Sequence, residues 1–88
     1  QVVTAYYLRL RVADQTGVLA DLTRILADEG ISIDGLIQRE AGEDEHQTDL
    51  VILTHDTAEA RMNAAIARMQ ALPSVGAPIV RIRKEELR

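Results

Sequence analysis

The stretch ADQTGVLADLTRILADEGISID, residues 13–34, contains the pattern that decides the fold. A polar turn with Gly17 leads into a segment whose hydrophobic residues form one stripe of a helix. The stripe consists of Val18, Leu19, Leu22, Ile25 and Leu26. Gly30 stands where a helix commonly ends in a residue with positive φ. A strand-like segment follows directly, so the stretch predicts a turn, an amphipathic helix and a strand in immediate succession.

Two more strands are predicted before the second helix, one on each side of the strand that follows the first helix. Hydrophobic and polar residues alternate over residues 6–13, which is typical of a strand with one hydrophobic face. The strand after the first helix is expected over residues 31–40, and Gly35 within it indicates a bulge or a close approach by another backbone. Unbroken hydrophobic residues at 50–53 predict a central strand over residues 49–54 whose two faces are both at least partly covered.

A second helix and a last strand complete the prediction. The helix is expected to begin at a capping box formed by Asp56 and Glu59, with Thr57 as the alternative cap. Its hydrophobic stripe consists of Met62, Ala65, Ile66, Met69 and Leu72. The pair Leu72-Pro73 should end it, because proline disfavours helical backbone at the preceding residue. A fourth strand is expected over residues 75–84.

The element order βαββαβ predicts an α+β fold, namely a ferredoxin-like sandwich. A four-stranded antiparallel sheet would have both helices on one face, with right-handed crossovers. The 88 residues suffice for one domain and not two, so residues 1–88 are expected to form a single domain. Because the central strand is hydrophobic on both faces, something else should cover part of the second face. A second copy of the domain is the simplest occupant.

Composition argues against several classes of partner and points to a compartment. The net charge of -4 at pH 7 disfavours nucleic acid and anionic membrane surfaces. No hydrophobic run approaches the roughly 20 residues of a membrane span. There is no cysteine, hence no disulfide framework and no thiolate metal site, which fits a reducing compartment, here the cytoplasm. The chain begins with Gln1 rather than methionine and is expected to be a fragment of a longer protein.

Catalysis by these residues alone is not expected. His46 and His55 have no nucleophile or metal ligand at a suggestive spacing. His55 and Asp56 could form half of a metal site, but a surface histidine at a strand–helix junction is the favoured interpretation. RNA could stack on strand aromatics, yet Tyr6 and Tyr7 are adjacent and point to opposite faces. We therefore expect no catalytic residue, no metal and no cofactor in this stretch of chain.

The turn before the first helix is the strongest candidate for a binding site. A helix N-terminus presents N–H groups without intrahelical partners and a partial positive charge, which suits a small carboxylate. Gly17 allows close approach to the backbone, and Asp14 could accept hydrogen bonds from an ammonium or hydroxyl group. A structural alternative stays open, in which Asp14 caps the helix and Gly17 is a turn residue. Ser32 lies at the far end of the helix, so one ligand could contact both ends only if two copies pair.

The run DQTGVLADLTRILADEGISI, residues 14–33, resembles the signature of the ACT domain family, small regulatory modules that bind amino acids. The resemblance implies that two copies pair side by side, with an effector between the first turn of one copy and the second strand of the other. The effector-binding residues carried over are Asp14, Thr16, Gly17, Val18, Leu19, Ile31 and Ser32. Thr16 and Ser32 depart from the family's proline and asparagine, which changes the stiffness of the turn and the polar group offered.

Three segments in order are similar to the C-terminal region of the bacterial homoserine dehydrogenase family: YYLRLRVADQTGVLADLTRILADEGISID, QTDLVILTH and NAAIARMQALPSV. This resemblance implies feedback regulation by threonine of an enzyme that reduces aspartate semialdehyde to homoserine with NAD(P). The implied partners are threonine, a second copy of the domain and the catalytic domains, which would hold the cofactor. The alternative is an assembly domain that dimerises the same enzyme and binds no effector.

Overall fold

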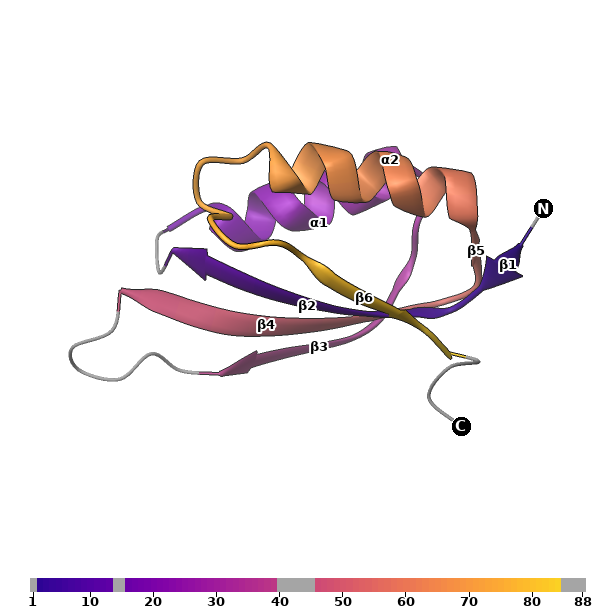
Figure 1. Cartoon of the computed structure of the whole chain (residues 1–88), viewed down its shortest axis with the longest axis horizontal. Helices are drawn as coiled ribbons and strands as arrows, with labels where there is room; N and C mark the ends of the chain where they lie inside the picture. The colour runs from indigo at the N-terminus through magenta and orange to yellow at the C-terminus, as the bar shows by residue number, and fades with distance from the viewer. Residues whose placement is uncertain (1, 14–15, 40–45, 85–88) are drawn as a thin grey trace.

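A computed structural model describes residues 2–13, 16–39 and 46–84. Its elements in chain order are β1 (Val3–Thr4), β2 (Tyr6–Ala13), α1 (Val18–Asp28), β3 (Ile33–Arg39), β4 (Gln47–Thr54), β5 (Thr57–Ala58), α2 (Glu59–Gln70) and β6 (Val80–Arg83). Four strands form an antiparallel sheet in the order β3-β4-β2-β6. Both helices lie on one face of this sheet (Figure 1). The predicted α+β sandwich is confirmed.

The hydrophobic core lies between the helices and the sheet. Along β2 every second side chain is buried, as the alternation in the sequence predicts. The buried hydrophobic residues are Tyr6, Leu8, Leu10, Val12, Val18, Leu22, Ile25, Leu26, Ile31, Leu50, Ile52, Met62, Ala65, Met69 and Val75. Seven of these fifteen residues come from the predicted stripes of α1 and α2, so those stripes are the surfaces that hold the helices on the sheet.

The strand β4 is central, as predicted, and lies between β3 and β2. Leu50 and Ile52 point to the helices and are 2% and 0% exposed, whereas Val51 and Leu53 are half-buried on the opposite face. The predicted irregularity at Gly35 is also confirmed, because the pairing of β3 with β4 shifts register between Ile33 and Gly35. The face of the sheet turned away from the helices is called the open face below.

The last strand is shorter than expected, because the predicted span 75–84 is interrupted. Val75 makes an isolated antiparallel bridge with Val12, and β6 begins only at Val80. Pro78 has no N–H to donate to a ladder. The Gln70 side chain holds the intervening loop instead, donating to the carbonyl of Ala77 over 2.8 Å and accepting from the N–H of Ile79 over 2.9 Å.

The predicted capping box is wrong. The N-cap residue of α2 is Ala58, Asp56 is exposed, and Thr57 lies in β5 with a buried hydroxyl. The short strands β1 and β5 pair with each other, which sequence patterns did not predict, and this keeps the backbone extended up to residue 58. The N–H of Glu59 donates to the carbonyl of Val2 over 3.0 Å. Backbone from the start of the chain thus satisfies a donor that the capping box was expected to satisfy.

The C-terminal end of α1 is closed by residues of α2. Gly30 has φ 74, as expected of a residue that ends a helix. Arg61 donates from Nη1 to the carbonyl of Glu29 over 3.1 Å. Arg68 forms ion pairs with Asp28 at 3.2 Å and with Glu29 at 3.0 Å. These contacts connect the two helices at this end.

Neither helix in the described part of the chain is long and apolar enough to cross a membrane.

Candidate functional site

Among the described residues, nothing closes the helix N-terminus that the turn before α1 presents. Gly17 is the N-cap residue with φ 92 and ψ -12, and a Cβ built on it would meet nothing within 4 Å. Thr16 and Gly17 are exposed. The first helical bond runs from the N–H of Asp21 to the carbonyl of Gly17 over 3.0 Å, so the preceding N–H groups have no acceptor within the helix. Backbone donors and the positive end of the helix dipole therefore lie beside accessible space.

Asp14 lies outside the described residues. Its proposed bond to an ammonium or hydroxyl group, and the alternative that it caps α1, both stay predictions.

A small cavity lies beneath the turn, between α1 and the sheet. Its volume is ≈ 40 Å³, and its lining consists of Val12, Ala13, Val18, Leu19, Gln38, Thr48 and Leu50. The hydroxyl of Thr48 donates to the carbonyl of Arg39 at the end of β3. A space of this volume is small for a whole amino acid. Within one copy, the turn offers part of a binding site and not a complete one.

The two remaining predicted residues lie at the other end of α1. An 11-residue helix separates them from the turn, which corresponds to roughly 16 Å. Ile31 is 4% exposed, and its N–H donates to the carbonyl of Leu26 over 2.9 Å. Ser32 is exposed, and its carbonyl accepts from the N–H of His55 over 2.9 Å. The structure thus brings Thr16, Gly17, Val18 and Leu19 together and leaves Ile31 and Ser32 apart from them.

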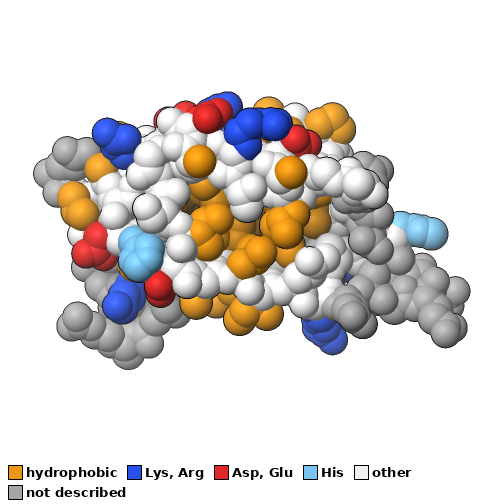
Figure 2. All heavy atoms as spheres, turned by 180° about the vertical axis from the view of Figure 1, so that it is seen from behind, with side chains coloured by type: hydrophobic (Ala, Val, Ile, Leu, Met, Phe, Trp, Pro, Cys, Tyr) orange, Lys and Arg blue, Asp and Glu red, His pale blue; other side chains and the backbone are white. Residues whose placement is uncertain are grey.

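The strand β3 forms one edge of the sheet and has exposed hydrophobic side chains. It pairs with β4, and Leu36 and Ile37 in its middle are 39% and 59% exposed. Seen from behind, the molecule has a patch of hydrophobic side chains in the middle of its surface, with charged side chains above it and to its left (Figure 2). An edge strand with unpaired backbone groups and hydrophobic side chains is a natural place for a second chain to pair.

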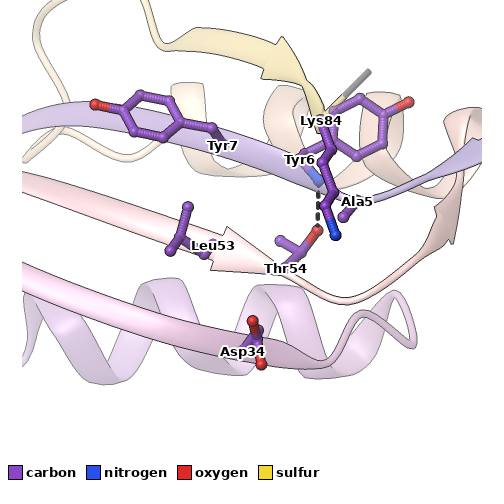
Figure 3. Close-up of a pocket in the computed structure, with 7 residues that line it drawn as sticks. All are labelled: Ala5, Tyr6, Tyr7, Asp34, Leu53, Thr54 and Lys84. Carbon is purple, nitrogen blue, oxygen red and sulfur yellow. Dashed lines mark hydrogen bonds between the residues drawn. The ribbon is translucent and has the colours of Figure 1, made fainter. Parts of the chain in front are cut away.

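A second hollow lies on the open face, at the end of the sheet away from the turn. It has a volume of ≈ 180 Å³ and is lined by Ala5, Tyr6, Tyr7, Asp34, Leu53, Thr54 and Lys84. The rings of Tyr6 and Tyr7 point in opposite directions, as their adjacency predicts, and the N–H of Tyr6 donates to the Thr54 hydroxyl (Figure 3). Asp34 and Lys84 come from opposite edges of the sheet. Sequence reasoning missed this hollow because its lining comes from four separate segments.

The possible metal site at His55 and Asp56 gains no support. His55 approaches Asp34 instead, with Nε2 3.3 Å from Oδ1, and both side chains are about 60% exposed, at 60% and 61%. Over the described ranges there is no group of three or more His, Cys, Asp or Glu side chains that could hold a metal ion. An exposed contact with a carboxylate at a strand–helix junction accounts for this histidine.

The fold and the open turn define a class of protein, a ferredoxin-like α+β module with a helix N-terminus beside an unpaired sheet edge. The profile of the ACT domain family matches residues 6–74, and the chain belongs to that family. It is 54% identical over 87 residues to a homoserine dehydrogenase of Methylobacillus glycogenes, covering 99% of this chain and 21% of that protein. The chain therefore spans about a fifth of the length of the curated relatives it matches.

Solved structures agree with this assignment. The crystal structure of a homoserine dehydrogenase from Thiobacillus denitrificans matches with a TM-score of 0.83 at 54% identity, over 93% of this chain and 17% of that one. The ACT domain from the GTP pyrophosphokinase of Chlorobium tepidum matches with a TM-score of 0.72 at 9% identity, over 92% of this chain and 100% of that one. The second likeness supports the fold alone. The chain is thus an ACT domain whose sequence matches one region of homoserine dehydrogenases.

Proposed function

We propose that this domain is the threonine-sensing part of a homoserine dehydrogenase and that residues 1–88 form one domain of that longer, cytoplasmic enzyme. Binding of threonine would reduce the flow of aspartate semialdehyde to homoserine by favouring one arrangement of paired domains. The size of that effect is limited by the difference in threonine affinity between the two arrangements. The observation that carries the proposal is the open N-terminus of α1 at Gly17, in a chain of this family.

The turn suits the carboxylate of an amino acid. First-turn N–H groups and the helix dipole stabilise a negative charge there, and Gly17 leaves the approach unobstructed. The ammonium group would be bound by Asp14, which immediately precedes the turn in sequence. The cavity of ≈ 40 Å³ beside Val18 and Leu19 has room for a methyl or hydroxyl group, which favours a small side chain such as that of threonine.

Pairing through the edge strand β3 would complete the site. A two-fold axis lays two β3 strands antiparallel, so the start of one lies beside the end of the other. The end of β3 is next to the turn, because Gln38 shares the small cavity with Val18 and Leu19. Ser32 of the partner subunit would therefore approach the turn, and Ile31 of the partner subunit would support it. This explains how residues at opposite ends of α1 can belong to one site.

The nicotinamide cofactor belongs to the remainder of the proposed enzyme. The glycines of this chain are at positions 17, 30, 35, 42 and 76, so no two are separated by a single residue. A dinucleotide-binding loop needs closely spaced glycines between a strand and a helix. The residues present do not fit NAD(P), and we assign this domain no step of the reduction.

Calorimetric titration of the 88-residue chain with threonine tests the proposal, with serine, isoleucine, methionine and lysine as competing ligands. We expect saturable binding of threonine by a dimer. Asp14→Ala should weaken binding by about 1–3 kcal/mol, the scale of a hydrogen bond to a charged group. Asn63→Ala is the control, because Asn63 is exposed on α2 and contacts Arg81 on β6, at the sheet edge away from β3. Equal affinities for both variants and the original chain would remove Asp14 from the site.

The runner-up is an assembly domain that pairs subunits and binds no effector. The exposed hydrophobic side chains of Leu36 and Ile37 support it as well as they support the sensor. Thr16 and Ser32, where the family pattern has proline and asparagine, favour it slightly. A folded dimer that releases no heat with any of the five amino acids would establish this alternative over the sensor.

A further inference from the structure

The open face of the sheet consists of three rows of side chains that run across the strands. The strand registers place the following residues side by side: Gly35, Leu53, Tyr7 and Ile82 in the first row, Ile37, Val51, Arg9 and Val80 in the second, and Arg39, Asp49 and Arg11 in the third. Two of the three rows are therefore mainly hydrophobic. Ile37 and Val80 are 59% and 40% exposed, so the described residues leave this surface uncovered.

Pairing through β3 does not cover this surface. Joining two sheets edge to edge extends them in their own plane, so the open faces of both copies become one larger hydrophobic surface. Contiguous hydrophobic surfaces of this kind usually mark a contact with another protein surface. The domain therefore needs a second contact, distinct from the one that the proposed effector site uses.

We propose that the occupant is a second copy of this chain, packed open face to open face about a two-fold axis that lies between the sheets, perpendicular to the strands. Packed sheets lie about 10 Å apart with their strands roughly aligned. With the axis between the first and second rows, the first row of each copy faces the second row of the other. Each contact then occurs twice, as an isologous interface requires.

The shapes of the facing residues complement each other in this arrangement. Gly35 faces Ile37 of the partner subunit, so the most exposed hydrophobic side chain on β3 meets the position without a side chain. Leu53 faces Val51 of the partner subunit. The ring of Tyr7 faces Arg9 of the partner subunit, and a guanidinium over an aromatic ring is a favourable contact. The charge of Arg9 in the second row thus meets the ring of Tyr7 in the first row of the partner subunit.

The charges at the two ends of the open face also match. Exchange of the rows places Asp34 near Arg39 of the partner subunit, at the rim where the pair is partly solvated. The hollow of ≈ 180 Å³ beside Asp34 gives room for that arginine, while Lys84 lies across the hollow next to Thr54 (Figure 3). The other in-plane two-fold axis, parallel to the strands, would place Arg9 over Val51 of the partner subunit. A guanidinium over an aliphatic side chain loses hydration without gaining a partner.

Gly35→Val gives a sharp steric test. A Cβ on Gly35 would lie 3.5 Å from Leu53 Cδ1, an ordinary contact, and its φ is not in the left-handed region, so the variant should fold. Its side chain would project from the open face into the space assigned to Ile37 of the partner subunit. Gly76→Val is the matched control, because a Cβ there has nothing within 4 Å. Circular dichroism and thermal unfolding check that both variants are folded.

Sedimentation equilibrium of the original chain and the two variants reads out the result. We expect Gly35→Val to halve the number of copies in the assembly, from four to two where β3 edges also pair or from two to one where they do not. Gly76→Val should leave the number unchanged. An unchanged assembly in Gly35→Val, or an original chain that is monomeric at all concentrations, overturns the inference. If the original chain and Gly35→Val are both dimers, the face-to-face contact is also overturned. The proposed threonine site is not affected by that outcome.

A charge exchange covers the case in which Gly35→Val fails to fold. Asp34→Arg and Arg39→Asp should each lower the association constant of the face contact, and the double variant should restore it. If the single variants associated less because contacts within one copy were lost, the double variant would not recover association. Failure of the double variant to recover association would show that these two residues do not meet. Threonine titration of the dissociated variants separates this contact from the proposed effector site.

Discussion

The two ends of α1 have the same residue type in the same backbone region and opposite surroundings. Gly17 at the start has φ 92 and Gly30 after the end has φ 74. A Cβ on Gly30 would lie 2.5 Å from Arg61 Nη1, whereas one on Gly17 would meet nothing within 4 Å. One end is completed by side chains of α2, and the other has no such neighbour among the described residues. A glycine at a helix terminus therefore does not by itself distinguish a structural end from a binding end, and the neighbours decide.

The largest loss of folding stability is expected from a change in the middle of α1, because both ends of the helix depend on its packing. Leu22 is 0% exposed, so Leu22→Ala leaves a cavity against the sheet. The free energy of unfolding should fall by about 2–5 kcal/mol, as for other leucines deleted from cores. Urea unfolding followed by circular dichroism measures this. A loss below about 1 kcal/mol would mean that the helix does not depend on this contact, because even a single methylene contributes nearly that much.

A smaller effect is expected at the closed end. Gly30→Ala forces an L-residue into the left-handed region and displaces Arg61 from the carbonyl of Glu29. Stability should fall by about 1–2 kcal/mol, the strain of such a residue. Threonine affinity should fall less than in Gly17→Ala, because Gly30 precedes Ile31 and Ser32, which are proposed to support the partner's site, and does not itself contact the ligand. A tenfold loss of affinity in this variant would place Gly30 in the effector site and remove the contrast between the ends.

At the open end, a substitution should reduce threonine affinity more than it reduces stability. Gly17→Ala has the strain of a left-handed alanine, about 1 kcal/mol, but displaces no neighbour. Its new methyl group enters the space assigned to the ligand, so threonine binding should weaken about tenfold, equivalent to ~1.4 kcal/mol. Calorimetry and urea unfolding on the same preparation separate the two effects. If affinity falls no more than in Gly30→Ala, the turn is structural and the assembly alternative gains weight.

The smallest effect is expected from the ion pairs that connect the helices. The hydrogen bond to Glu29, and after it the one to Asp28, raise the pKa of Arg68 above its usual range, and an arginine is already protonated at neutral pH. Salt is therefore a better probe than pH. Arg68→Met should lower the melting temperature slightly in dilute buffer, and the difference should vanish near 1 M salt, where the Debye length is about 3 Å. A difference that persists there would indicate packing rather than charge.

Sequence patterns predicted the sandwich because each element has a strong local signal. The stripe of α1 and the alternation in β2 both follow from which side chains meet the core. The capping box failed because the start of α2 is set by Val2, which is far away in sequence. The break before β6 depends on Gln70, whose side chain holds the loop at Ala77. Patterns read along the chain cannot show such contacts.

The candidate site was only partly accessible to sequence reasoning. The turn residues Thr16 to Leu19 are consecutive, so a local pattern identifies them together. Gln38 and Thr48 share the cavity with Val18 but come from two different strands, and no spacing in the sequence indicates this. Ile31 and Ser32 would join only across a pair of chains, so one chain cannot test them.

The strand order β3-β4-β2-β6 has a consequence for how the chain folds. The strands β3 and β4 are neighbours in sequence, whereas Tyr6 pairs with Arg83 near the other end of the chain. Contacts between distant residues form late, because closing long loops costs more entropy. We expect pulse-labelled hydrogen exchange to show amides of the β3–β4 hairpin protected before those of β6, and simultaneous protection would contradict this order. Until β6 docks, one side of β2 has unpaired backbone groups, and the half-folded chain is then most exposed to strand exchange with another copy.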